Sequence, residues 1–173
     1  MRFWKMHGLG NDYVVIDNRI QEISDDKVSR LAERLCERRF SVGADGLLLV
    51  YNSSVADVKM RIFNSDGSEA EMCGNGIRCF AKYCYENGIV KKDEYLVETL
   101  AGIKHIWLTL NGTEVTSVKV DMGAPNWQRI SLPMIGEGTC INQSLEVNSE
   151  LYKVTCLSMG NPHCITFVEN VDL

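Results

Sequence analysis

Tight turns between short apolar segments are the feature that most constrains how this 173-residue chain can fold. Such turns join antiparallel neighbours in a sheet, whereas a parallel pair needs a crossover of roughly a dozen residues or more. The spacing therefore favours an α+β fold with a mixed, largely antiparallel sheet over a doubly wound parallel sheet. The turns are Gly8–Asn11, Asp66-Gly67, Ala101-Gly102 and Asn111-Gly112.

Hydrophobic periodicity places the individual elements between these turns. The loose segment from Pro125 to about Asn148 marks a boundary after them. We expect helices over about 24–40 and 74–86, and strands over 3–8, 12–17, 47–51, 58–63, 94–100, 103–110 and 114–122.

The net charge of −5 argues against a nucleic-acid partner, because no stripe of Lys or Arg offsets it. Arg34, Arg38 and Arg39 lie among Glu33 and Glu37, and we interpret this cluster as a solvated helix face. A small charged metabolite fits this composition better than a polyanion.

Neither a leader nor a membrane span is evident. The first twenty residues contain no apolar segment of signal-peptide length, and the longest apolar run, 47–51, is too short to cross a bilayer. We therefore expect a cytoplasmic protein. Its seven cysteines form no C-x-x-C pair and are expected to be free thiols, and three widely spaced histidines argue against a zinc site.

Cys73 stands immediately before Gly-Asn-Gly, where the second helix is expected to begin. The first backbone N–H groups of a helix have no intrahelical acceptor, and they favour negative charge, whether thiolate or carboxylate. Gly74 and Gly76 would let a ligand approach this backbone. We expect Cys73 to be reactive, and Cys79 and Cys84, within the helix body, to be structural.

A thiolate at this position has two uses that these residues leave open. It could be a nucleophile paired with a histidine such as His163, or it could accept a proton from a carbon acid.

A weak internal repeat links the two ends of the chain. The segments "GNDYVVIDN" at 10–18 and "GNPHCITFVEN" at 160–170 both place Gly-Asn just before an apolar strand.

The segment "NSDGSEAEMCGNGIR" at 64–78 resembles the signature N-x-D-G-S-x4-C-G-N-G/A-x-R of the diaminopimelate epimerases at each fixed position. "KMHGLGND" at 5–12 and "SMGNPHC" at 158–164 are also similar to blocks of that family, in the expected order. The resemblance covers the whole chain. It implies an isomerase of lysine and peptidoglycan-precursor biosynthesis that uses no cofactor and interconverts LL- and meso-diaminopimelate.

In such enzymes two cysteines act on opposite faces of one α-carbon, one as thiolate base and the other as thiol acid. The resemblance implies that Cys73 is one of this pair and that Gly74 and Asn75 hold the substrate carboxylate. It further implies substrate contacts from three amides and a histidine that tunes the pKa of the cysteines; these residues are Asn11, Asn64, Asn161 and His163.

The family fold has two similar mixed α/β domains, each with a sheet around a central helix. We therefore expect residues 1–120 to form the first domain and 121–173 to begin the second, incomplete here. Asn11 precedes Cys73 by 62 positions, so the partner cysteine would fall roughly fifty residues beyond Leu173. We expect an N-terminal portion with half an active site that is inactive alone, from a protein that is a homodimer at full length.

One substrate contact is in doubt, because this chain has Gly46 where some family members have glutamine. Two alternatives stay open. The first is a related racemase or isomerase of the same fold, similar to proline racemases or phenazine-pathway proteins. The second is a binding module without catalysis that keeps the carboxylate-binding helix end.

Overall fold

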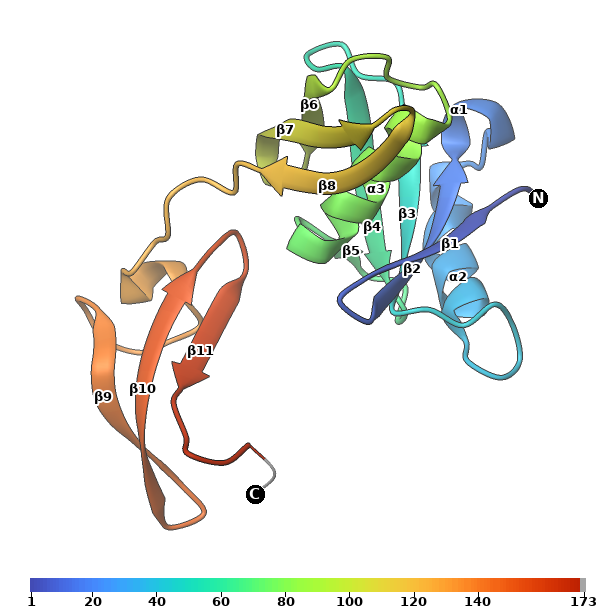
Figure 1. The fold of residues 1–173 in the computed structure, drawn as a ribbon. Helices are drawn as coiled ribbons and strands as arrows, with labels where there is room; N and C mark the ends of the chain where they lie inside the picture. Colours follow the sequence, from blue (N-terminus) through green and yellow to red (C-terminus); the bar gives the residue numbers. More distant parts are fainter. Residues whose placement is uncertain (172–173) are drawn as a thin grey trace. The chain divides into compact units, whose positions relative to one another are not determined.

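The structure, a computed structural model, describes residues 1–171 and divides the chain into two compact units, Met1–Asp121 and Met122–Leu173 (Figure 1). Within the described residues, no helix is long and apolar enough to span a membrane. The first unit contains β1 (Trp4–Gly8), β2 (Asn11–Asp17), α1 (Asn18–Gln21), α2 (Asp25–Cys36), β3 (Gly46–Tyr51), β4 (Val58–Asn64), β5 (Glu69–Ala70), α3 (Gly74–Glu86), β6 (Glu94–Thr99), β7 (Gly102–Asn111) and β8 (Glu114–Val120). The second contains the 3-10 turn η1 (Arg129–Ser131), β9 (Cys140–Val147), β10 (Glu150–Ser158) and β11 (Pro162–Thr166).

The first unit is built on an eight-stranded sheet of order β1-β2-β3-β4-β6-β7-β8, with β5 paired to β4. The pairs β2–β3 and β4–β6 are parallel, and the other neighbours are antiparallel. This mixed sheet, which curls around one helix, confirms the fold class expected from the turns and from the family resemblance.

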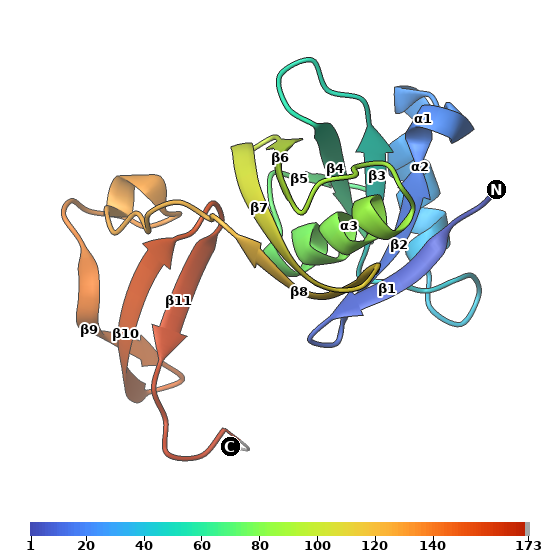
Figure 2. The ribbon, with the colours of Figure 1, turned by 45° about the horizontal axis from the view of Figure 1, so that its top comes forward.

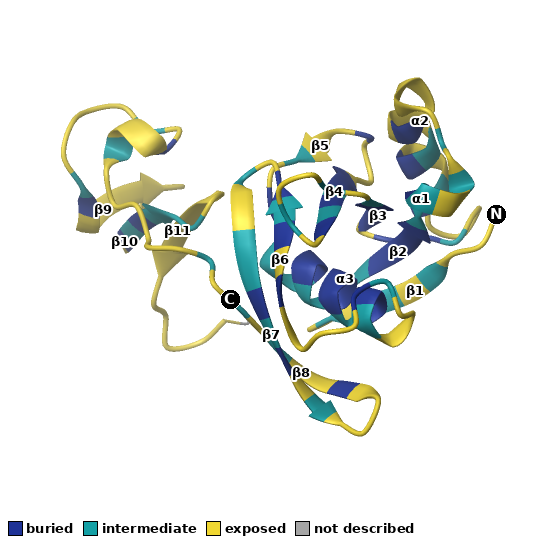
Figure 3. Cartoon of the chain, turned by 90° about the horizontal axis from the view of Figure 1, so that it is seen from above, coloured by how far each residue is buried: buried dark blue, intermediate teal, exposed yellow. Residues whose placement is uncertain are grey.

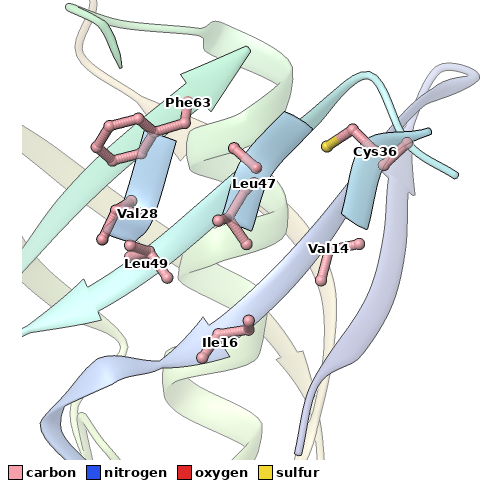
Figure 4. Close-up of a cluster of buried hydrophobic side chains, with 9 residues drawn as sticks. Val14, Ile16, Val28, Cys36, Leu47, Leu49 and Phe63 are labelled. Atoms are coloured by element: carbon pink, nitrogen blue, oxygen red, sulfur yellow. The ribbon is translucent and has the colours of Figure 1, made fainter. Parts of the chain in front are cut away.

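Strand β3 is buried on both of its faces, which explains its unbroken apolar run. On one face, Leu47 and Leu49 pack with Val28 of α2 and with Phe63 of β4 (Figure 4). On the other face, the side chain of Leu48 lies against α3 at Gly76, where a Cβ atom would stand 3.3 Å from Leu48 Cδ2. The sheet is therefore sandwiched between α2 and α3 at its centre.

Helix α3 is the core of the first unit, with the curled sheet around it (Figure 2). Most of its circumference is apolar and buried, and Phe80 is fully buried. At its C-terminal half, the Tyr95 hydroxyl donates to Ala81 O at 2.9 Å and Trp4 packs edge-on against Tyr83. A helix buried on this much of its surface needs elements on several sides, which the strands β1 to β8 supply.

The helix expected over 24–40 is too long at its C-terminal end, because α2 stops at Cys36. Glu37 is extended, and the chain turns back so that the N–H groups of Gly43 and Ala44 reach the last helical carbonyls, those of Leu35 and Cys36, at 2.9 and 3.1 Å. These two N–H donors take the place of those that the next turn of helix would supply.

The second unit is an antiparallel sheet of order β11-β10-β9 whose residues are mainly exposed (Figure 3). The loose segment expected up to Asn148 is wrong over residues 140–147, which form β9. Asn148 and Ser149 have φ of 52° and 66°, the conformation of a two-residue hairpin turn, and they join β9 to β10. A turn without glycine gives a weak signal in the sequence, so the hairpin was missed.

Burial of Phe80 in α3 leads to the first prediction. Replacing Phe80 by Ala should lower the free energy of unfolding by about 3–5 kcal/mol, because the ring leaves a cavity inside the curled sheet. Urea unfolding monitored by circular dichroism measures this loss. The matched control is Phe40→Ala, whose ring is 85% exposed and which should change the free energy by at most about 0.5 kcal/mol. Equal effects of the two substitutions would contradict the central place of α3.

Candidate active site

Cys73 occupies the N-cap position of α3, directly before the first helical residue, as expected from the sequence. Its backbone is extended, with φ −144° and ψ 120°, and its carbonyl accepts from Ile77 N at 2.9 Å. The side chain of Cys73 is half-buried, and so are Gly74 and Asn75. Cys73 thus stands at the end of α3 whose first N–H groups favour negative charge, although its side chain makes no capping hydrogen bond to them.

Two polar groups from the start of β2 contact the sulfur, and Asn75 of α3 contacts one of them. Cys73 Sγ lies 2.9 Å from the Tyr13 hydroxyl and 3.8 Å from Asn11 Oδ1. Asn75 Nδ2 donates to the same Asn11 Oδ1 at 3.4 Å, and the Tyr13 hydroxyl also donates to it. The structure therefore brings together Asn11, Cys73 and Asn75, and adds Tyr13, which the sequence analysis did not select.

The amide of Asn11 is held in one orientation by Asp45. Asn11 Nδ2 donates to Asp45 Oδ2 at 2.7 Å, so Oδ1 must face Tyr13 and α3. Asp45 also accepts from Asp12 N at 3.0 Å and from the Arg38 guanidinium at 2.7 Å. Asp45 is a second residue that sequence reasoning missed, since an acidic residue in a loop carries no signal of its own.

Arg38 is exposed, as expected of a solvated residue, but the expectation that it lies on a helix face is wrong. It lies beyond the end of α2 and donates to both oxygens of Asp12 as well as to Asp45. Lys5 adds a second cation, 2.8 Å from Asp12. Hydrogen bonds from Arg38 hold the pKa of the Asp12 carboxyl well below its usual range, and the bond from Asn11 lowers that of Asp45.

Arg78, the last fixed position of the signature, fixes the start of α3 from within the helix. It donates to Gly74 O at 2.9 Å and to Asn75 Oδ1. Because Oδ1 of Asn75 is occupied in this way, Nδ2 points toward Asn11. Arg78 therefore orders the carboxylate-binding helix end expected from the sequence.

Asn64 lies at the end of β4, in the same row of the sheet as Tyr13. The row runs from Tyr13 through Gly46 to Asn64. Asn64 is exposed, and its amide donates to Ser68 Oγ at 2.9 Å within the turn that follows. It thus shares the end of the sheet with Tyr13, but in the part of the chain that the structure describes it makes no hydrogen bond to Cys73.

Asn161 and His163 belong to the second unit, in the turn and strand after β10. His163 Nε2 lies 3.1 Å from Asn161 Oδ1, and both residues are exposed. The structure brings these two residues together within their own unit.

The other cysteines of the first unit differ from Cys73 in their surroundings. Burial raises the pKa of the Cys36 thiol to about 11, and it also raises the pKa values of Cys79 and Cys84. These three are neutral thiols at pH 7 and fit the structural role expected of Cys79 and Cys84. All seven cysteines are free, as expected.

Comparisons with known sequences identify one family. The family model described as diaminopimelate epimerase matches residues 3–128. The chain is 54% identical over 172 residues to a protein named diaminopimelate epimerase from Moorella thermoacetica, covering 99% of this chain and 61% of that protein. It is 47% identical over 173 residues to a protein of the same name from Methanococcus maripaludis, covering 99% of this chain and 62% of the relative. The chain thus spans about three fifths of the length of these relatives.

Solved structures with a similar fold are also isomerases or related proteins. A hydroxyproline epimerase from Agrobacterium vitis, with bound trans-4-OH-L-proline, superposes with a TM-score of 0.72 at 15% identity, over 99% of this chain and 52% of that one. A phenazine biosynthesis protein of the PhzF family from Bacillus anthracis gives a TM-score of 0.66 at 25% identity, over 99% of this chain and 58% of that one. The first likeness concerns the fold alone.

The second prediction concerns acid stability. The folded-state pKa of Asp12 lies below the unfolded value of about 3.9, so its ion pairs stabilise the fold above about pH 4 and are lost as the pH falls through the folded value. Asp12→Asn should therefore reduce the fall in urea midpoint between pH 6 and pH 3. Asp93→Asn, an exposed carboxylate outside this cluster, serves as the control. An unchanged pH dependence in Asp12→Asn would show that these pairs add no stability.

Proposed function

The chain belongs to the diaminopimelate epimerase family, and we propose that it supplies Cys73 as one of two acid–base cysteines that interconvert LL- and meso-diaminopimelate without a cofactor. The observation that carries this proposal is the position of Cys73 at the N-terminus of α3, with Asn11 and Tyr13 on its sulfur. A base beside a site for the substrate carboxylate is what abstraction of an α-hydrogen requires.

The proposed reaction is a proton transfer at one carbon. A cysteine thiolate takes the α-hydrogen as a proton and becomes a thiol, and the electron pair of the C–H bond stays on the substrate, spread into its carboxylate. A thiol on the opposite face then donates its proton to the same carbon and becomes a thiolate. The N–H groups at Gly74 and Asn75 would bind the carboxylate, whose negative charge grows in between.

Asn11, Asn64 and Asn75 are proposed to contact the substrate from the first unit, and Asn161 from the second. Asn11 and Asn75 have amides fixed by Asp45 and Arg78, which suits them to discriminate among the charged groups of an amino acid. His163 is proposed to modulate the pKa of the cysteine pair.

The partner cysteine is proposed to lie on a second domain, of which residues 122–173 are the beginning. We further propose that the whole protein acts in lysine biosynthesis in the cytoplasm and is a homodimer. Its relatives are longer than this chain, which covers 61% of the Moorella protein.

The third prediction tests Cys73 in a two-domain protein. Residues 1–173 would be joined to the segment of the Moorella thermoacetica relative that follows the aligned region, and LL-diaminopimelate would be followed by proton NMR in D2O. We expect loss of the α-hydrogen signal and formation of the meso isomer. Cys73→Ser should lower the rate at least about 100-fold, because general acid–base catalysis contributes 10² or more.

The control for this experiment is Cys84→Ala, which removes a fully buried thiol from the body of α3 and should leave most of the activity. Residues 1–173 alone should form no meso isomer, because one thiol cannot serve both faces of the carbon. The two-cysteine proposal would be contradicted if the chimera with Cys73→Ser kept its turnover, or if residues 1–173 alone inverted the α-carbon. Tight binding of diaminopimelate without exchange would favour a binding module.

A further inference from the structure

Tyr13 has a polar group buried at the candidate site that the proposed reaction does not yet use. The residue is 3% exposed, and its hydroxyl lies 2.9 Å from Cys73 Sγ while also meeting Asn11 Oδ1. A hydroxyl has one hydrogen to donate, so it can serve one of these two acceptors at a time.

Two glycines, one on β3 and one on α3, lie next to the phenol ring. A Cβ atom on Gly46 would stand 3.4 Å from Tyr13 Cδ1 and Cε1, and one on Gly76 would stand 3.4 Å from Tyr13 Cζ. Neither glycine has a positive φ, so the backbone conformation does not require them. What they provide is space for the close approach of β4 and α3, since a Cβ atom on Gly46 would stand 2.7 Å from Phe63 O and one on Gly76 would stand 3.3 Å from Ile62 Cδ1.

The second unit contains a matching arrangement. His163 follows Asn161 by two residues, as Tyr13 follows Asn11, and each ring has a polar atom at the amide oxygen of its own asparagine. The two Gly-Asn segments of the internal repeat thus each present a hydrogen-bonding ring at the same position.

We propose that Tyr13 is a positioning residue that stabilises Cys73 in both of its protonation states. When Cys73 is a thiolate, the Tyr13 hydroxyl donates its hydrogen to Sγ. When Cys73 has taken a proton, its S–H donates to the Tyr13 oxygen, and the hydroxyl hydrogen turns to Asn11 Oδ1. The catalytic meaning of this exchange rests on the proposed function, but the hydrogen bond itself does not.

No proton leaves Tyr13 in this scheme, so the atoms balance with one proton on Cys73 and none lost elsewhere. Burial, followed by the bond to Cys73, raises the pKa of Tyr13 well above its usual value, which keeps the phenol protonated. Because Asn11 Nδ2 donates to Asp45, the amide oxygen Oδ1 of Asn11 remains turned toward Tyr13 and can accept the hydrogen of its hydroxyl.

The titratable and charged groups around this pair come from the loop before β3 and from α3. Asp45 precedes β3, Arg78 and Cys79 lie on α3, and each acts on Tyr13 or on the start of the helix. Within residues 1–171, none of these three makes a hydrogen bond to Cys73 Sγ, whereas Tyr13 does. Removal of the Tyr13 hydroxyl should therefore directly change the reactivity of the Cys73 thiol.

The test is alkylation of Cys73 by iodoacetamide as a function of pH, in the wild-type chain and in Tyr13→Phe. Trypsin cleavage after Arg61 and Arg78 gives the peptide 62–78, in which Cys73 is the one cysteine, so mass spectrometry reports its reaction alone. We expect the pH of half-maximal alkylation to rise by about one unit in Tyr13→Phe, because the thiolate loses a charge-assisted hydrogen bond.

Tyr51→Phe is the matched control, since it removes a hydroxyl from the far end of β3 and should leave the profile unchanged. Tyr13→Phe keeps the buried ring, and circular dichroism would verify its fold. An unchanged alkylation profile in a folded Tyr13→Phe chain would overturn the inference.

A second readout separates this inference from the proposed function. In the two-domain chimera, Tyr13→Phe should shift the pH profile of kcat/KM in the same direction, which a purely structural role would not do. A shifted alkylation profile together with an inactive chimera would support the hydrogen bond and count against the epimerase. An active chimera with neither profile shifted would retain the epimerase and reject the role of Tyr13.

Discussion

The enclosure of α3 by the curled sheet is the constraint on which the rest of the first unit depends. A helix that buries most of its circumference can leave only its ends for polar chemistry, and its N-terminus has N–H groups that need acceptors. Gly76 sets the closest approach of helix to sheet, since its missing side chain admits Leu48 and Ile62. This packing brings Cys73 to the edge where β2 and β3 begin. The location of the site therefore follows from hydrophobic burial.

The orientation of the polar side chains at this edge is fixed by a chain of hydrogen bonds that starts at the surface. Arg38 binds Asp45, which binds Asn11, whose carbonyl oxygen then faces Cys73. From the other side, Arg78 fixes the amide of Asn75. An asparagine can present either end of its amide, so such fixed partners decide whether the site offers donors or acceptors. Charges that look like ordinary surface residues in the sequence thus determine which polar atoms face the thiol.

The helices and strands with strong local sequence signals were the ones predicted correctly. The helix Gly74–Glu86 was predicted at both ends, because glycines precede it and Asn87-Gly88 follows it. The end of α2 and the strand β9 were not predicted, because the backbone donors of Gly43 and Ala44 decide where α2 ends and a turn without glycine follows β9. Within the site, Cys73 stood out by its position. Tyr13 did not, because an aromatic residue in an apolar strand is the ordinary pattern of a core.

The two Gly-Asn segments present rings of different kinds, the phenol of Tyr13 in the first unit and the imidazole of His163 in the second. In the first unit the hairpin β1–β2 pairs Gly8 with Asn11, and in the second the hairpin β10–β11 closes around Asn161. Tyrosine remains a neutral donor at physiological pH, whereas histidine can donate or accept according to its protonation state. If both segments serve a cysteine, the two thiols would have different partners. In the proposed two-cysteine reaction the two thiols differ in protonation state at any moment, and a phenol beside one and an imidazole beside the other would be a chemical basis for that asymmetry.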